Sequence, residues 1–221
     1  MKTTWCAETA SKAYIDTVKA VKPGGFPSVA SGFEDSNVAE LVSAMAAGFK
    51  AQLIVEAWTR GGDLSTSIAL SIASRHTKGR HVCVVPDERS RLEYRDATRL
   101  AGVSPDFIVG EAEEVMCGLP GVDFVVVDCR RKDFAKVLRF AKMSVRGGVL
   151  VCKNAHPRSV PGFRWRGILG SGTRVVRSAF LPFGKGMEIA QVASGVSGSG
   201  NKSRWIKHID QHTGEEHVFR R

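Results

Sequence analysis

The sequence lacks the features that mark membrane-spanning and secreted proteins. None of its apolar runs approaches the ~18 consecutive residues that a membrane helix needs. The segment Met1–Lys12 is polar and mixes charges, unlike a secretory signal. The five cysteines are odd in number and show no CxxC spacing, which argues against a disulfide framework or a zinc site. We therefore expect reduced thiols, no membrane partner, and a location in the cytoplasm or the nucleus.

Several catalytic and metal-binding motifs are also missing. There is no Gly-x-Ser-x-Gly elbow and no phosphate-binding P-loop. Only His208 and His212, of the six histidines, have the spacing of a helical metal pair. They lie in a polar segment that contains glycine, so solvated side chains are the favoured interpretation.

Acidic residues are scarce in one part of the chain. Residues 130–186 hold 14 basic side chains and a single acidic one, Asp133, whereas residues 1–129 hold 13 basic and 17 acidic side chains. The net charge of +10 is therefore concentrated in the later part of the chain. Such a cluster is either a solvated basic face or a surface that attracts a polyanion or a phosphorylated ligand.

Short apolar runs alternate with helical patterns between residues 52 and 153. Parallel strands joined by crossover helices explain this alternation, because right-handed βαβ units leave little alternative. The predicted strands are Gln52–Ala57, His81–Val85, Asp106–Val109, Asp123–Asp128 and Gly148–Lys153, and the predicted helices are Ala7–Val21, Asn37–Phe49, Leu64–Arg75, Glu88–Ala101, Glu111–Cys117 and Asp133–Met143.

The alternation ends after residue 153. Residues 157–172 read as a loop, and Thr173–Leu181 and Met187–Ala193 read as the two strands of a hairpin. We predict an α/β fold with about seven strands, mostly parallel with one antiparallel strand, and helices on both faces. Residues 1–194 would form one domain, and the Gly/Ser-rich and polar residues 195–221 a linker and tail.

The order of these elements resembles that of the class I S-adenosylmethionine-dependent methyltransferases, whose Rossmann-like sheet ends in an antiparallel hairpin. Leu181–Met187 resembles the hairpin of the metal-dependent catechol and caffeoyl-coenzyme A O-methyltransferases, and Gly147–Leu150 resembles the turn into their fifth strand. The whole chain is more closely similar to a plant family, domain of unknown function 1442, often described as methyltransferase-like. Residues 44–56 and 203–221 carry that match, which implies no known substrate.

The first predicted strand leads into a loop where a methyltransferase holds the methionine part of its cofactor. Glycines there let the backbone approach the ligand, and the amino end of a helix follows. The resemblance therefore implies contacts to S-adenosylmethionine from Glu56, Gly61, Gly62 and Ser65.

This loop departs from the family pattern. Trp58 and Arg60 stand near the positions of the usual glycines, and the loop is one residue longer. Trp58 could block the pocket or line it. A plain strand-to-helix turn capped by Asp63 or Ser65 explains the same residues.

Further candidate contacts follow the next two predicted strands. The family places an acidic residue for the ribose hydroxyls at a position that is Val85 here, and Asp87 lies two residues later. Asp87 either reaches the ribose or caps the following helix, and capping is the favoured interpretation. The segment Gly110-Glu111-Ala112 resembles the one that borders the adenine, which assigns Glu111 and Ala112 to the cofactor.

The catechol-type enzymes bind a magnesium ion through two aspartates and an asparagine, which orients and acidifies the acceptor hydroxyl. The matching positions here are Asp128, Lys153 and Asn154. A lysine puts a cation where the metal would bind, so we expect no metal. Lys153 is instead expected to pair with Asp128, with the two charged groups ~3–4 Å apart. The family's catalytic lysine matches Arg131, which stays protonated and is a poor base.

Two functions remain open at this stage. One is a metal-independent, S-adenosylmethionine-dependent methyltransferase in which Asp128 and Asn154 position the acceptor and Lys153 is the base; methyl transfer itself needs mainly in-line positioning. The other is a catalytically degenerate fold that binds an anionic partner, either a phosphorylated ligand or a nucleic acid. Phe163 and Trp165 interleave with the basic residues that would make this contact. The anion-binding patch would comprise Arg130, Arg131, Arg158, Arg164 and Arg166.

Overall fold

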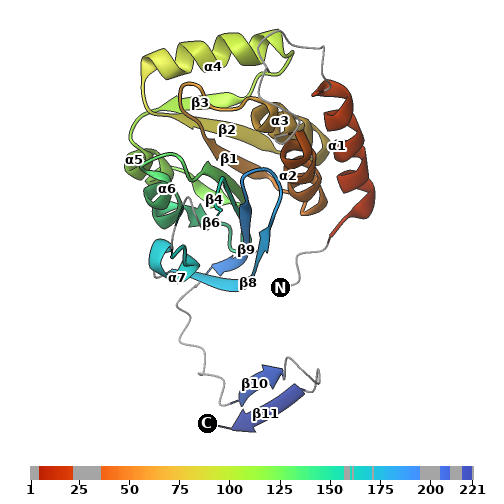
Figure 1. The fold of residues 1–221 in the computed structure, drawn as a ribbon, viewed down its shortest axis with the longest axis vertical. Coiled ribbons are helices and arrows are strands. Elements are labelled where there is room, and N and C mark those ends of the chain that lie inside the picture. Colours follow the sequence, from red (N-terminus) through yellow and green to blue (C-terminus); the bar gives the residue numbers. More distant parts are fainter. Residues whose placement is uncertain are drawn as a thin grey trace.

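A seven-stranded sheet lies at the middle of the molecule (Figure 1). The computed structural model describes residues 5–21, 36–156, 160, 162–170 and 172–194, and the backbone of 205–209 and 216–220. The strand order is β3-β2-β1-β5-β7-β9-β8. The strands are β1 Leu53–Ala57, β2 Arg80–Val85, β3 Asp106–Val109, β5 Phe124–Asp128, β7 Gly148–Lys153, β8 Thr173–Leu181 and β9 Met187–Ser194.

Only β9 runs against the other strands of this sheet. The strands β3, β2, β1, β5 and β7 pair in parallel, whereas β9 is antiparallel to both β7 and β8. The predicted sheet, mostly parallel with one antiparallel strand, is therefore confirmed. The chain order also reverses between β1 and β5, because β1 continues toward β2 and β3 on one side whereas β5 and β7 lie on the other.

Helices cover both faces of the sheet (Figure 1). The first face packs against α1, α2, α3 and α4, and the second against α5, α6 and α7. The bounds are α1 Ala7–Ala20, α2 Ser36–Gly48, α3 Ser65–Thr77, α4 Glu88–Leu100, α5 Ala112–Cys117, α6 Phe134–Phe140 and α7 Trp165–Ile168.

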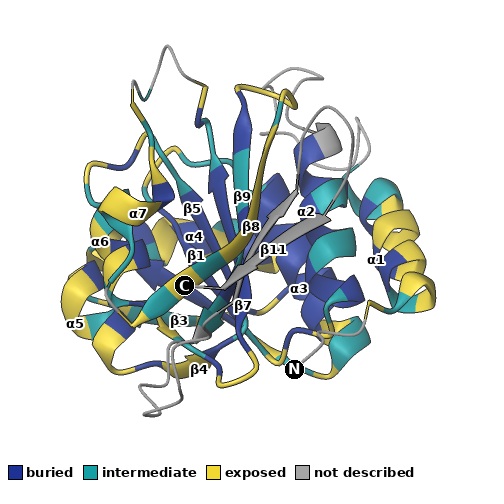
Figure 2. Ribbon diagram, turned by 90° about the horizontal axis from the view of Figure 1, so that it is seen from below, coloured by how far each residue is buried: buried dark blue, intermediate teal, exposed yellow. Residues whose placement is uncertain are grey.

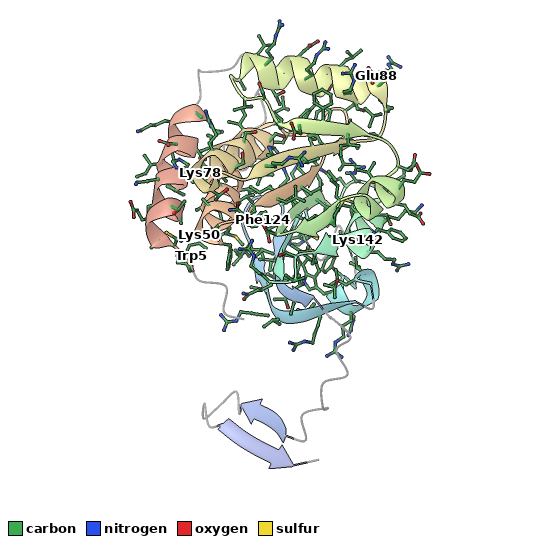
Figure 3. The ribbon with its side chains drawn as sticks, turned by 180° about the vertical axis from the view of Figure 1, so that it is seen from behind. Trp5, Lys50, Lys78, Glu88, Phe124 and Lys142 are labelled. Carbon is green, nitrogen blue, oxygen red and sulfur yellow. The ribbon has the colours of Figure 1, made fainter. Side chains whose placement is uncertain are left out.

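Alternate residues of each central strand enter two different cores. In β5, Phe124 and Val126 pack toward α2 and α3, whereas Val125 and Val127 pack toward α5 and α6. A strand covered on both faces is apolar at every position, and this is why β5 reads as a continuous run. Figure 2 shows these strands as buried, between helices whose outer faces are exposed, and Figure 3 labels Phe124 in the interior.

Most predicted helices and strands have bounds within one or two residues of those in the structure, but two segments differ by more than that. The helix expected over Asp133–Met143 ends at Phe140, and Lys142–Met143 form the short strand β6, which pairs in parallel with β4, Pro120–Val122. The loop expected over residues 157–172 contains the helix α7. Both features depend on contacts with distant residues, which a local pattern does not record.

Two more strands lie in the region predicted as linker and tail. The strands β10, Trp205–Ile209, and β11, Glu216–Arg220, form an antiparallel pair. The Gly/Ser-rich stretch before β10 lies outside the described residues. Among the described helices, none is long and apolar enough to cross a membrane.

Candidate functional site

A small pocket opens at the carboxyl ends of β1 and β5, where the strand order reverses. Ligands of open α/β sheets bind at such a switch point. The pocket has a volume of about 20 Å³. Its lining combines residues from β1, β5, β7 and the loop after β1: Glu56, Ala57, Trp58, Thr59, Gly62, Asp63, Val126, Val127, Asp128, Arg131 and Lys153. Four of the candidate residues from the sequence therefore line this pocket: Glu56, Gly62, Asp128 and Lys153.

Glu56 is almost fully buried, with 3% of its surface exposed. Its Oε2 accepts a hydrogen bond of 3.3 Å from the hydroxyl of Tyr94, on α4. The Nε2 atom of His81, on β2, lies 3.4 Å from the same oxygen. Burial and the charge of Glu56 raise the pKa of Tyr94 well above its ordinary value, so the phenol stays protonated and remains a donor.

Trp58 fills the loop where a methyltransferase has glycine. The side chain is buried, its ring packs 5.2 Å from that of Tyr94, and its backbone N–H donates to the carbonyl of Val84. The indole Nε1 has no hydrogen-bond partner within the described residues. A Cβ atom at Gly62 would lie 2.7 Å from Nε1, so the ring leaves room for glycine alone at that position. Trp58 therefore lines the pocket with a buried ring.

The loop is fastened to three other elements. The buried Arg131 donates from Nη1 to the carbonyl oxygen of Trp58 at 2.6 Å. Arg60 and the backbone N–H of Gly61 both contact the carboxylate of Glu93, on α4, at 3.1 and 3.2 Å. Asp63 accepts from the N–H of Ser65, at the start of α3. The loop is therefore held in a closed position.

A cofactor of the size of S-adenosylmethionine does not fit this closed pocket. A volume of about 20 Å³ holds little more than one water molecule, which needs about 10–15 Å³ on the same measure. The residues have suitable polarity, but Trp58 and the fastened loop occupy the volume. Binding of such a ligand requires the loop to move.

The candidate catalytic residues form a network that differs from the predicted one. Lys153 donates from Nζ to Thr66 Oγ1 at 2.6 Å and pairs with Asp63 at 3.8 Å. Asp128 pairs with Arg130 at 2.5 Å and accepts from Nδ2 of Asn154 at 2.8 Å. The predicted ion pair between Lys153 and Asp128 is therefore wrong, because Asp63 in the loop and Thr66 in the first turn of α3 bind the ammonium.

These contacts set the protonation state of Asp128. Burial by itself would raise the pKa of Asp128, but the hydrogen bonds from Arg130 and Asn154 outweigh burial and lower it below 3.8. Asp128 is therefore an anion at neutral pH. Asn154 adopts a left-handed backbone conformation with φ of 57°, which asparagine tolerates better than most residues, and its amide faces Asp128.

A second shallow pocket adjoins the first on the side of the β8–β9 hairpin. It shares Asp63 and Lys153 with the first pocket and has a volume of about 10 Å³. Its remaining lining comes from Val38, Arg130, Asn154, Phe183, Lys185, Gly186 and Met187. A group bound there would lie among three cations and one carboxylate.

The other predicted cofactor residues lie at the same edge of the sheet but outside the first pocket. Asp87 accepts from the N–H of Ser90 at 2.7 Å and so caps α4, which confirms the favoured interpretation. Glu111 precedes α5 at its N-cap position, and Ala112 is buried. Their contact with a cofactor stays a prediction.

One residue of the predicted anion-binding patch, Arg131, is not available to a ligand. Arg131 is buried and binds Asp133 as well as Trp58, so its guanidinium does not face a ligand. Phe163 packs between Phe134 and Trp165, and the indole of Trp165 donates to Glu188. The aromatic rings are thus used in packing. Arg164 and Arg166 are exposed, and Arg158 lies outside the described residues.

The described residues contain no cluster of three or more histidine, cysteine, aspartate or glutamate side chains suited to a metal ion. At the position that matches the metal site of the catechol-type enzymes, Asn154 donates to Asp128, whereas Lys153 binds Thr66 and Asp63, and its ammonium stands in the place of a carboxylate ligand. These residues do not fit a divalent ion.

Comparison with known proteins identifies the family. The model of a protein family of unknown function (DUF1442) matches residues 1–221. The chain belongs to this family. No curated protein matches it.

Solved structures share the fold of this DUF1442 protein at low sequence identity. A methyltransferase from Geobacter sulfurreducens is 20% identical with a TM-score of 0.55, over 82% of this chain and 96% of that one. The SAH-bound Podospora anserina methyltransferase PaMTH1 is 16% identical with a TM-score of 0.54, over 86% and 89%. A putative caffeoyl-CoA O-methyltransferase from Staphylococcus aureus is 14% identical with a TM-score of 0.56, over 81% and 97%. These likenesses establish a Rossmann-like methyltransferase fold.

Three polar residues near the pocket escaped the sequence reasoning: His81, Tyr94 and Thr66. A signal was present in the helix α3, whose Ser65–Ser74 segment is buried throughout although half of it is serine or threonine. A buried hydroxyl needs a partner. Such a helix therefore indicates buried polar groups on the strands beneath it.

Proposed function

We propose that this protein binds S-adenosylmethionine at the switch point between β1 and β5 and is a metal-independent methyltransferase whose acceptor carries an anionic group. The observation that carries the proposal is the convergence of Glu56, Gly62, Asp128 and Lys153 on one pocket there. The SAH-bound relative with the same fold supports the choice of cofactor.

Cofactor entry would begin with the loop at residues 58–63. Its contacts to Glu93 are surface interactions, which are weak and exchange readily. Outward movement would take Trp58 from the pocket and expose the carboxylate of Glu56. The indole Nε1, which has no partner in the closed loop, would gain a hydrogen bond to water or ligand.

The acceptor would lie in the adjoining pocket beside the β8–β9 hairpin. Arg130, Lys153 and Lys185 line it and favour a carboxylate or phosphate on the acceptor. Asp128 and Asn154 would orient the acceptor by hydrogen bonds. The pairing of Lys153 with Asp63 would have to open before the ammonium could contact the acceptor.

Calorimetry of the full chain with S-adenosylhomocysteine tests the proposal. We expect saturable one-to-one binding at micromolar to submillimolar ligand. Ultraviolet cross-linking of radiolabelled S-adenosylmethionine, followed by peptide mapping, should place the label within residues 56–66. The absence of any binding heat at millimolar ligand, or a label found only on other peptides, would overturn the proposal.

A second candidate function follows from the closed pocket itself. A degenerate methyltransferase fold that no longer admits a cofactor would keep Trp58 in place permanently and use its cationic surface to bind an anion. The volume of about 20 Å³ favours this candidate. This candidate predicts that calorimetry detects no binding heat with S-adenosylhomocysteine. It also predicts that the fluorescence of Trp58 stays unchanged when the ligand is added.

A further inference from the structure

A buried chain of polar groups runs beneath α3. Ser71 Oγ, on α3, lies 2.9 Å from His81 Nδ1, and His81 Nε2 lies 3.4 Å from Glu56 Oε2. All three residues are buried, and the side chains of His81 and Glu56 are exposed by only 1% and 4%. A hydroxyl, an imidazole and a carboxylate are therefore connected in sequence inside the protein.

The carboxylate determines which nitrogen of His81 carries the proton. If Nδ1 held it, the lone pair of Nε2 would face the oxygen of Glu56, and the two would repel. With the proton on Nε2, that N–H faces the carboxylate and Nδ1 accepts from the hydroxyl of Ser71. The distance of 3.4 Å is an electrostatic contact and not a full hydrogen bond, and Nε2 has no other partner among the described residues. Tyr94 donates to the same oxygen and helps to hold it in place.

This arrangement is the one that activates a serine nucleophile. A base within hydrogen-bond reach of the hydroxyl, itself oriented by an acidic group, is recognised by geometry and not by sequence order. In this site Nδ1 of His81 faces the serine hydroxyl, and Glu56 faces Nε2. Either imidazole nitrogen can accept a proton, so His81 can act as the base and Glu56 as the group that orients it.

The serine and the histidine both line a cavity. It has a volume of about 410 Å³, larger than either pocket at the carboxyl ends of the strands, and lies at their amino ends. Its lining is mostly polar: Ser71, Ser74, Arg75, Gly79, Arg80, His81, Gly102, Val103, Ser104, Pro105 and Asp106. The volume suits a small molecule.

We propose that this cavity is a second active site, in which Ser71 hydrolyses an ester or thioester of a small carboxylic acid. Ser71 Oγ bonds to the acyl carbon while its proton passes to His81 Nδ1. The bond to the leaving alcohol or thiol breaks, and that group takes the proton from His81. Water then attacks the acyl-serine, again losing its proton to His81, and the carboxylic acid leaves as Ser71 is restored.

The charges around the cavity support the reaction and restrict the substrate. Arg75 and Arg80 line it, and a guanidinium near the acyl group stabilises the negative oxygen that develops during attack. Arg80 is paired with Asp106 at 2.8 Å, so we assign Arg75, the other arginine of the lining, to this oxygen or to an anionic acyl chain. Esters of short, neutral or acidic acids therefore fit best.

A fluorophosphonate ester, which reacts covalently with activated serines, tests the proposal on the full chain. Peptide mass spectrometry should show one adduct, on Ser71. The adduct should be absent in Ser71→Ala, and His81→Gln should slow its formation by about 100-fold or more. Hydrolysis of p-nitrophenyl acetate should fall in parallel.

Ser11→Ala is the control. Ser11 is an exposed serine of α1 whose hydroxyl donates to the backbone carbonyl of Ala7 at 2.9 Å, and it does not line the cavity. Labelling in this variant should stay within twofold of the wild type. An unmodified Ser71 in the wild-type protein, at reagent concentrations that saturate a reference esterase, overturns the proposal whatever the variants do. Labelling is measured without any cofactor present, so failure of the one proposal is distinguishable from failure of the other although Glu56 belongs to both sites.

Discussion

Arg131 Nη1 donates a hydrogen bond of 2.6 Å to the carbonyl oxygen of Trp58, a residue 73 positions earlier in the chain. The same guanidinium binds both carboxylate oxygens of Asp133, at 2.8 and 2.6 Å. One buried arginine therefore connects the loop after β1 to the loop after β5, and both loops border the candidate site.

Removal of this connection should destabilise the fold. Arg131→Ala leaves a buried carbonyl and a carboxylate without their donor, and we expect the free energy of unfolding to fall by about 2–4 kcal/mol. Urea denaturation measures it. Lys132→Ala, at the exposed neighbour, should change the value by no more than about 0.5 kcal/mol. Equal effects of the two changes would show that the buried contacts contribute nothing.

Trp58 should limit access to the switch-point pocket. Trp58→Ala removes the ring that fills the pocket, and we expect the affinity for S-adenosylhomocysteine to rise at least tenfold by calorimetry, although the variant should lose about 3–5 kcal/mol of stability. Trp5→Ala is the control, because Trp5 packs on Phe49 and does not line the pocket. A lower affinity in Trp58→Ala would mean that the indole is part of the binding surface.

Asp128 should make stability depend on pH. The pKa of Asp128 is lowered in the folded protein, because the hydrogen bonds from Arg130 and Asn154 outweigh burial. Its contribution to the free energy of unfolding is therefore complete above the ordinary pKa of 3.8, and it disappears as the pH falls through the pKa of the folded protein. Asp128→Asn should be less stable than the wild type at pH 7, and the difference should shrink below pH 3.8. Urea midpoints at several pH values test this. Asp96→Asn, at a surface position, should show no such convergence.

Two glycines with the same backbone conformation should respond differently to alanine. Gly121 and Gly147 have φ of 81° and 82°, but a Cβ at Gly147 would clash with the carbonyl oxygen of Val192, whereas one at Gly121 would meet no atom of the described residues within 4 Å. Gly121→Ala should cost about 1–2 kcal/mol through backbone strain alone. Gly147→Ala should cost about 1–3 kcal/mol more. Thermal unfolding of both variants gives the comparison, and similar losses would contradict the predicted clash.

The local pattern of apolar residues was sufficient to predict the strands of the central sheet. Val125–Val127 are apolar in succession because each is covered by helices on its own face, and Asp87 reads as a cap because its helix follows at once. Such features depend on neighbours in the sequence. The β6 strand at Lys142–Met143 was not predictable in this way, since it exists only through pairing with Pro120–Val122.

The candidate site was predicted as a location and not as a network. The register does place Lys153 beside Asp128, as expected from the ends of β5 and β7. A lysine side chain is long and flexible, however, and its ammonium binds Asp63 in the loop and Thr66 at the start of α3. The sequence does not encode which of several nearby acids binds a given cation. Only the folded loop decides that.

The position of β9 between β7 and β8 affects how the protein is made. On the ribosome β8 emerges before β9, and it has no place on the sheet until β9 follows and pairs with it. The hairpin is therefore the unit that docks last, and until then the apolar edge of β7, Gly148–Lys153, is open to pairing with other nascent chains. Ribosome stalling between residues 181 and 194 should expose that edge for longest, so those nascent chains should be the ones that chaperones capture most.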